Sequence, residues 1–326
     1  DQAREVGVRD DLFPVIYESG EVIGRVSAKA SKECNLSTET LVVSGGGDVQ
    51  LGSAGLGVVE EGECAVLGGT FWQQTVNIKS QTPPPSNMDI RVNPHVIKGL
   101  SQAEGITFFS GLIMRWFRDA FCNEEKQEAL RVGKDAYTLL EERAKSVPVG
   151  SNGIIPIFSD EMRYGKWYHA APSFINLGID PELYNKYSMF RSLQENACIV
   201  SAINLEKTFA FSGIGSQAIV FAGGASKGEL WSQILSDVSG LPVHIPKVTE
   251  ATALGAAFSA GVGAGVYASI KEAAKSLVVW EREYQPSMQN HTLYNELKHR
   301  WREIYARELR LVDDGLTTSM WKAPGV

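Results

Sequence analysis

The stretch AIVFAGGASKGELWSQILSDVSGLPVHIP, residues 218–246, decides the fold class. A β-rich run, AIVFA, leads into the glycine turn GGASKG, which is followed by a helical segment and a second strand, PVHIP. A strand, a tight turn and a helix that returns to another strand are typical of α/β folds. Glycines at the carboxyl end of a strand let a ligand approach the backbone. The stretch therefore predicts an α/β fold with a ligand-binding turn at Gly223–Gly228.

A second strand-to-helix turn carries a carboxylate. The apolar run Leu41–Ser44 enters three glycines, Gly45–Gly47, and a helix is expected to follow Asp48. The Asp48 side chain could simply cap that helix, although three glycines exceed what a cap requires. It could also act as a general base that activates a hydroxyl group. The residues alone leave both interpretations open.

A third glycine turn lies between two expected strands. The runs CAVLGG, ending at Gly69, and FWQQTVN, after Thr70, predict a hairpin. The tip could bind phosphate oxygens through N–H groups and the Thr70 hydroxyl, whereas an ordinary hairpin turn is the commoner explanation. The next segment, GITFFSGLIMRWFRDAF from Gly105, repeats apolar residues at helical spacing. We expect it to form a helix that packs on the core.

The composition excludes several classes of function. The 326 residues carry a net charge of −7, so no basic field is present to bind nucleic acid or anionic lipid. The 4 cysteines form no CxxC pair and the 5 histidines no HxxxH pair, which argues against a metal cage and favours a reducing cytoplasm. The uncharged run Ala251–Ile270 has the length of a membrane span, but its glycine and alanine content predicts a helix packed tightly inside a soluble fold.

Two glycine patterns differ from the common nucleotide-binding motifs. GGASKG lacks the GxxxxGK spacing of a Walker A loop, and GVGAGV from Gly261 does not follow a strand as a dinucleotide motif does. We interpret the second pattern as packing. The first remains a candidate nucleotide turn, because its backbone can approach a base or a phosphate before a helix begins.

Taken in order, five segments resemble the carboxyl-terminal domain of the FGGY carbohydrate kinases: GGGDVQLG, LGGTFWQQ, GITFFSGLIMRWFRDAF, VFAGGASKGELWSQILSDVSGLPV and EATALGAAFSAGVGAG. The resemblance covers essentially the whole chain. It implies an actin-like (ribonuclease H-like) ATPase domain, with a mixed β-sheet flanked by helices. Residues 1–40 would be a remnant or linker from an amino-terminal kinase domain, and residues 41–326 the nucleotide-binding domain with its C-terminal helix and tail.

The resemblance also implies roles for individual residues. Asp48 matches the catalytic base, which takes the proton of the substrate hydroxyl as that hydroxyl attacks the γ-phosphate of ATP. Thr70, after Gly69, matches a threonine that contacts phosphate. The positions that match the nucleotide site are Gly111, Arg115, Gly223, Gly224 and Gly228.

Two of these positions depart from the glycerol kinases, which carry Gln in place of Arg115 and Asn in place of Gly228. Any contact at Gly228 would therefore involve backbone alone. Gln50 and Trp72 lie close to Asp48 and Thr70 in the sequence. They are candidates for the substrate pocket, although no motif assigns them a role.

The reaction implied is ATP-dependent phosphorylation of a small polyol or sugar-like alcohol, with Mg²⁺ held mainly by phosphates and water. Three functions stay open: a kinase for a small polyol signal, another FGGY kinase of the xylulose or glycerol type, or a nucleotide-binding module inactive in isolation. The expected partners are the substrate, ATP or ADP, and the amino-terminal domain. Signal kinases of the family are also associated with the phosphocarrier protein HPr.

Overall fold

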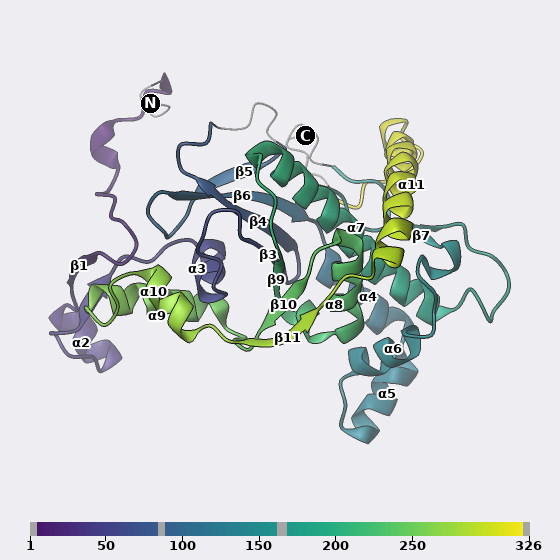
Figure 1. Ribbon diagram of the computed structural model, residues 1–326, viewed down its shortest axis with the longest axis horizontal. Helices are drawn as coiled ribbons and strands as arrows, with labels where there is room; N and C mark the ends of the chain where they lie inside the picture. The colour runs from purple at the N-terminus through teal and green to yellow at the C-terminus, as the bar shows by residue number, and fades with distance from the viewer. Residues whose placement is uncertain (1–4, 84–88, 162–167, 322–326) are drawn as a thin grey trace. The chain divides into compact units, whose positions relative to one another are not determined.

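The computed structural model describes residues 5–83, 89–161 and 168–321 (Figure 1). The chain divides into two compact units. The first consists of Asp1–Gly57, His95–Lys98 and Glu250–Leu277; the second consists of Val58–Pro94, Gly99–Thr249 and Val278–Val326.

A seven-stranded mixed sheet forms the centre of the second unit, in the order β11-β10-β9-β3-β4-β6-β5. Its strands are β3 (Cys64–Gly68), β4 (Trp72–Lys79), β5 (Arg91–Pro94), β6 (Leu100–Thr107), β9 (Ile219–Ala222), β10 (Val243–Pro246) and β11 (Trp280–Tyr284). Strand β9 is parallel to β3 and β10, and β4 is antiparallel to β3 and β6. Strands β3, β6, β9 and β10 therefore end at the same edge of the sheet.

Helices pack on this sheet and on one another: α4 (Ser110–Phe121), α5 (Asn123–Val132), α6 (Ala136–Ala144), α7 (Lys186–Ser212), α8 (Glu229–Ser239) and α11 (Met288–Asp313). Helix α7 contacts β4 and β6, α8 contacts β10 and β11, and α11 lies against α8 and α7 (Figure 1). The remaining elements of this unit are η2 (Ser151–Gly153), η3 (Gly224–Lys227) and the two-stranded sheet of β7 (Ile155–Ile157) and β8 (Ser173–Ile175).

Helix α7 is buried along most of its length, so its sequence shows no single polar face. Two of its buried polar side chains, Ser201 and Asn204, bond to Gln74 of β4. In α11, Trp301 and Tyr305 are buried, and Leu297 and Ile304 pack against the same core.

The first unit contains η1 (Asp10–Leu12), β1 (Val22–Arg25), α2 (Ala28–Cys34), β2 (Leu41–Val43), α3 (Asp48–Gly55), α9 (Ala251–Gly263) and α10 (Ile270–Leu277). Helices α3 and α9 pack backbone to backbone. A β-carbon built on Gly55 would lie 2.0 Å from the Ala251 carbonyl oxygen, and one on Gly255 would lie 1.9 Å from that of Leu51. The prediction that the uncharged run Ala251–Ile270 packs tightly as a helix is confirmed only where α9 meets α3. Helix α9 ends at Gly263, its buried residues are Gly255, Phe258 and Ser259, and half of the run is exposed. No helix within the described ranges is long and apolar enough to cross a bilayer.

The helix predicted from Gly105 begins later than expected. Strand β6 extends to Thr107 and pairs with β4, and α4 begins at Ser110. The expectation that this helix packs on the core holds only in part: Trp116 is 42% exposed, and the buried side chains are those of Ser110, Met114 and Phe117. A short apolar run that spans the end of a strand and the start of a helix does not show where one gives way to the other.

Candidate functional site

Three turns follow strands that end at the same edge of the sheet: Gly68–Thr70 after β3, Phe108–Gly111 after β6, and Gly223–Lys227 after β9. The Gly111 N–H donates to the Thr70 carbonyl oxygen at 3.2 Å. A β-carbon built on Gly111 would lie only 2.2 Å from the Gly69 carbonyl oxygen. The first two turns are thus in direct backbone contact, which only glycine allows.

The third turn packs on the first in the same way. Gly223 has a φ of +95°, and a β-carbon there would lie 2.8 Å from the Gly68 carbonyl oxygen. Gly224, by contrast, has no atom within 4 Å of a built β-carbon, and it is exposed together with Gly69 and Thr70. The cluster therefore presents backbone that a ligand can approach closely. This is the arrangement in which ligands bind at the carboxyl ends of strands in α/β sheets.

Gly228, which follows the third turn and is the N-cap residue of α8, has a neighbour that the sequence did not reveal. A β-carbon at this position would lie 2.2 Å from Oε1 of Glu141, a buried side chain of α6. Burial raises the pKa of Glu141, and hydrogen bonds donated by Gln194 and by the Leu230 and Trp231 N–H groups oppose that rise. The carboxylate therefore occupies the N-terminus of α8.

This contact corrects the expectation that the start of α8 is open to phosphate. The Leu230 and Trp231 N–H groups, which would otherwise face an anion, already donate to Glu141. A side chain at position 228 would meet the Glu141 carboxylate. The open part of the third turn is Gly224.

Two arginines lie on α4 beyond the second turn. Arg115 is exposed, and its charge acts on the phenol of Tyr137. Arg118 pairs with Asp119 through two hydrogen bonds of 3.0 and 2.9 Å and lies over the Tyr137 ring. Arg118 thus forms a salt bridge with its neighbour in the chain.

Asp48 lies in the first unit, at the start of α3. Gly47 is the N-cap residue and Asp48 is the first residue of the helix, so the interpretation of Asp48 as a plain N-cap is wrong. Its Oδ1 accepts the Val49 N–H at 2.9 Å, and its backbone carbonyl accepts the Thr252 hydroxyl at 3.1 Å. The carboxylate is exposed. The preceding turn is tightly packed, because a β-carbon on Gly46 would lie 2.4 Å from Cγ1 of Val96.

The two pocket candidates differ in their surroundings. The Gln50 side chain is buried and folds back over the Asp48 turn, with its Oε1 2.3 Å from a β-carbon built on Gly47. Trp72 has no exposed surface, and its ring lies 5.1 Å from that of Phe221 and 4.9 Å from that of Trp231. The expectation that Trp72 lines a pocket is therefore wrong: it is the first residue of β4 and points into the core.

A buried histidine follows β5 in the segment that packs with the Asp48 turn. Burial lowers the pKa of His95 to about 4, so the ring is neutral near pH 7. Its Nδ1 accepts the Ile97 N–H at 3.0 Å, which leaves the proton on Nε2. Within the described part of the chain, that Nε2 has no hydrogen-bond partner.

The next question is whether titratable side chains of the described residues gather into a metal centre. Among residues 5–83, 89–161 and 168–321, no three His, Cys, Asp or Glu side chains gather in a group that could hold a metal ion. All four cysteines are free thiols. Burial raises the pKa of Cys64 to about 12 and that of Cys122 to about 11, which makes both thiols unreactive.

Comparison with known proteins identifies the family. Residues 75–264 match the C-terminal domain of the FGGY family of carbohydrate kinases. The chain belongs to this family. It is 57% identical to the autoinducer-2 kinase of Salmonella paratyphi A and 58% identical to that of Escherichia coli K12, over 320 residues in each case. These matches cover 98% of this chain and 60% of each relative, so the chain spans about 60% of the length of the curated relatives it matches.

Solved structures show the same fold. The xylulose kinase of Rhodospirillum rubrum superposes with a TM-score of 0.77 at 21% identity, covering 92% of this chain and 60% of that one. The glycerol kinase of Plasmodium falciparum, solved with ADP, gives a TM-score of 0.75 at 17% identity and covers 95% of this chain and 59% of that one. The expected actin-like ATPase fold, a mixed sheet flanked by helices, is confirmed.

Proposed function

We propose that the chain is the carboxyl-terminal part of a kinase that uses ATP to phosphorylate autoinducer-2, a quorum-sensing signal. The substrate would be its linear form, 4,5-dihydroxypentane-2,3-dione, and the product would carry phosphate on the terminal hydroxyl. Family membership supports phosphoryl transfer to a small alcohol, and the identity to autoinducer-2 kinases supports this substrate. The observation that carries the proposal is the exposed Asp48 carboxylate, held at the start of α3 by a packed glycine turn.

In the proposed reaction, the Asp48 carboxylate accepts the proton of the terminal hydroxyl. That oxygen bonds to the γ-phosphorus of ATP while the bond from this phosphorus to the β,γ-bridging oxygen breaks, and ADP leaves. Positioning and electrostatics dominate phosphoryl transfer, so the chain mainly needs to hold its reactants in line. We assign phosphate contact to Gly69 and Thr70.

We assign the nucleoside to the surface of the third turn at Gly223 and Gly224, where Gly224 leaves open space. Gly111 supports the phosphate turn from behind through its contact with Gly69. Arg115 is exposed one helical turn beyond and is proposed to contact the nucleotide. Mg²⁺ would offset the negative charge of the triphosphate, held chiefly by phosphate oxygens and water.

Other parts of the proposal rest on the family and on the length of the relatives. We propose that an amino-terminal domain completes the substrate pocket, and that the protein works in the cytoplasm, where ATP is available and thiols stay reduced. The phosphocarrier protein HPr is proposed as a partner on the resemblance alone.

A second candidate function is phosphorylation of another sugar or polyol by the same base. The likeness in fold to xylulose and glycerol kinases supports it. A third candidate is a module that binds nucleotide and needs its amino-terminal domain for turnover.

A coupled assay of ADP release separates these functions. The complete protein is tested with dihydroxypentanedione, xylulose and glycerol, and we expect turnover with the first substrate only. Turnover with xylulose or glycerol in its place would overturn the proposed substrate. The 326-residue chain is tested in parallel; we expect it to bind ADP weakly without turnover, and measurable turnover would refute the need for a further domain.

A further inference from the structure

The segment after α11 returns to the turn that follows β6. The Trp321 ring is nearly parallel to the Phe108 ring, with 6.0 Å between centroids and 23° between planes. The same indole lies 5.8 Å from the ring of His169. The backbone N–H of His169 donates to the Trp321 carbonyl oxygen at 3.2 Å and to Oγ of Ser319 at 3.1 Å. Residues 319–321 are therefore joined to this turn by the ring contact with Phe108, and to His169 by a ring contact and hydrogen bonds.

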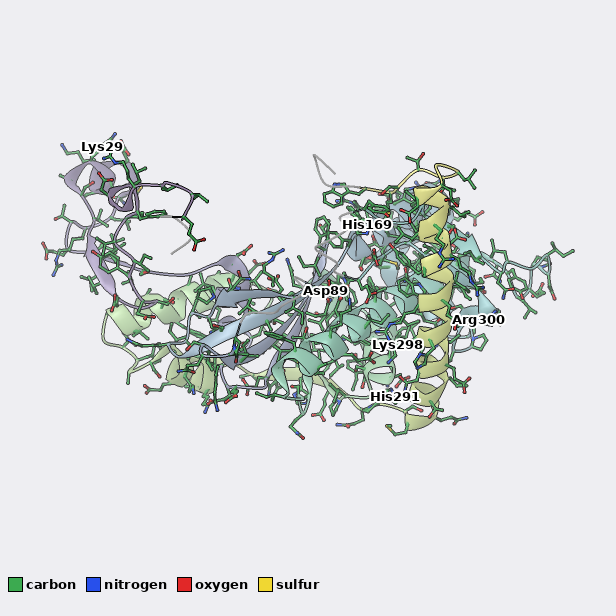
Figure 2. The ribbon with its side chains drawn as sticks, turned by 90° about the horizontal axis from the view of Figure 1, so that it is seen from above. Lys29, Asp89, His169, His291, Lys298 and Arg300 are labelled. Atoms are coloured by element: carbon green, nitrogen blue, oxygen red, sulfur yellow. The ribbon has the colours of Figure 1, made fainter. Side chains whose placement is uncertain are left out.

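His169 is itself held firmly. Its Nδ1 lies 3.4 Å from the Asp160 carboxylate, and the two side chains are only 5% and 2% exposed. The neighbouring Tyr168 hydroxyl donates to Asp313, the last residue of α11. Figure 2 accordingly shows His169 near the carboxyl end of this helix, with His291 near the opposite end. The ring thus forms a fixed support for its aromatic neighbours.

The turn after β6 has a strained backbone conformation, which its neighbours must hold in place. Phe109 has a φ of +61°, in the left-handed region that bulky side chains rarely adopt. Such a residue keeps this conformation only when its surroundings hold it there. Here Phe71 packs against Phe108 and Phe109 at 6.0 and 5.2 Å, and His169 packs against the same two rings at 4.6 and 6.0 Å.

This turn leads directly into the candidate site. Two residues after Phe109, the Gly111 N–H donates to the Thr70 carbonyl oxygen, and the Gly111 α-carbon packs against Gly69. A shift of Phe109 would move Gly111 and, with it, the Gly68–Thr70 turn.

We propose that Trp321 and His169 are positioning residues of the nucleotide site, which hold the turn after β6 in the strained conformation that fixes the Gly68–Thr70 turn. The assignment of the Gly68–Thr70 turn to phosphate rests on the proposed function. The mechanical link from Trp321 to Gly111 rests on the contacts alone. The C-terminal segment is thereby part of the site's framework, although no sequence motif indicates it.

The test compares three substitutions in the 326-residue chain. Trp321→Ala removes the ring, and Trp321→Phe restores an aromatic ring at the same place. Trp280→Ala is the matched control: this tryptophan is 45% exposed on β11 and pairs with a histidine ring, that of His244, at 5.3 Å. If Trp321→Ala does not fold, Trp321→Leu, which keeps apolar bulk without a ring, takes its place.

Two measurements are made on each protein. Hydrogen–deuterium exchange without nucleotide reports the protection of the amides of residues 109–113, and calorimetry reports the affinity for ADP. For Trp321→Ala we expect faster exchange in this segment and an ADP affinity lower by about tenfold. Trp321→Phe should recover most of both properties, and Trp280→Ala should change neither.

Unchanged protection of residues 109–113 in Trp321→Ala would overturn the positioning role. Faster exchange of these amides with an unchanged ADP affinity would overturn the connection between Trp321 and the nucleotide site. If the unsubstituted chain binds no ADP, the proposed function of the turn fails, while the exchange comparison still decides whether Trp321 holds it.

Discussion

The α-carbon of Gly111 lies against the carbonyl oxygen of Gly69, so closely that a β-carbon at position 111 would stand 2.2 Å from that oxygen. The obstacle is backbone, which cannot rotate away as a flexible side chain can. The Gly111 N–H also donates to the Thr70 carbonyl oxygen. The start of α4 and the turn after β3 are therefore joined by direct backbone contacts.

Gly111→Ala should consequently separate the two turns. We expect a loss of about 1–3 kcal/mol in the free energy of unfolding, as for other overpacked sites, together with weaker ADP binding. Gly224→Ala should differ, because its methyl group would enter open space: thermal stability should be unchanged while ADP affinity falls. Thermal melts and calorimetry measure both effects. Gly215→Ala, also without neighbours within 4 Å, is the control. A Gly111→Ala protein as stable as the parent would show that the turns are not in contact.

Asp48→Asn tests the base in the complete protein. Loss of a general base should lower kcat by about 100-fold to 10,000-fold, because the amide cannot accept the proton of the substrate hydroxyl. The affinity for ATP should stay within about twofold, since Asp48 is not assigned to the nucleotide. Steady-state kinetics measures kcat, and calorimetry measures the affinity for ATP. Glu33→Gln, an exposed change on α2, should leave both unaltered. Near-normal turnover of Asp48→Asn would remove Asp48 from the mechanism.

Gly255→Ala tests the contact between α3 and α9. At an exposed position in a helix, a change from Gly to Ala raises the free energy of unfolding by about 1 kcal/mol. Here the new methyl group would lie 1.9 Å from the Leu51 carbonyl oxygen, so we expect a loss of about 1–3 kcal/mol instead. Chemical unfolding shows whether the substitution lowers or raises the free energy of unfolding. The control, Gly24→Ala, lies in the same unit and has no atom within 4 Å of the added carbon. A stabilised Gly255→Ala protein would contradict the close packing.

Glu141→Gln tests the carboxylate at the start of α8. Glutamine offers one acceptor oxygen where the carboxylate offers two, and its NH₂ group would face backbone donors. A loss of about 1–3 kcal/mol in the free energy of unfolding is expected from the unsatisfied groups. Urea titration provides the measurement. Glu142→Gln, one residue along the same helix and exposed, should change stability by less than about 0.5 kcal/mol. Equal stabilities of the two variants would mean that Glu141 does not cap α8.

His95 should make stability depend on pH. Its pKa is about 4 in the folded protein, against an ordinary value of 6.5. Between these values the unfolded chain binds a proton that the folded chain does not, so stability falls as the pH falls from 6.5 toward 4. The full shift corresponds to about 3 kcal/mol. His95→Gln should lose this part of the pH dependence, whereas His299→Gln, an exposed control, should keep it. Melting curves at pH 7 and 4.5 measure this pH dependence of stability. Parallel pH profiles for His95→Gln and the parent would exclude His95 as its source.

The local parts of the fold could be predicted from the sequence. The unit β9, η3, α8 and β10 lies where its strand, glycine turn and helix patterns indicated, because each pattern depends on neighbours in the chain. The hairpin of β3 and β4 is confirmed for the same reason. The contact of Gly111 with Gly69 could not be derived in this way, since it depends on two strands that pair through a third.

The errors concern neighbours that are distant in the sequence. Trp72 follows a glycine turn closely enough to suggest a pocket, yet its ring packs between Phe221 and Trp231. Gly228 matches a nucleotide position, yet its closest neighbour is Glu141 on another helix. A single sequence contains no record of such contacts. The roles of Asp48, Gln50, Thr70 and Arg115 stay predictions until they are measured.

The hydrogen bond from Thr252 to the Asp48 carbonyl joins residues 204 positions apart. During synthesis, helix α3 leaves the ribosome long before α9 exists. At about 5–20 residues per second, the intervening chain takes roughly 10–40 s to make. Throughout that interval the glycine face of α3 has no partner, and the unit that holds Asp48 cannot complete its packing. The unit that holds the proposed catalytic aspartate can therefore complete its packing only after Thr252, 204 positions later in the chain, has been synthesised.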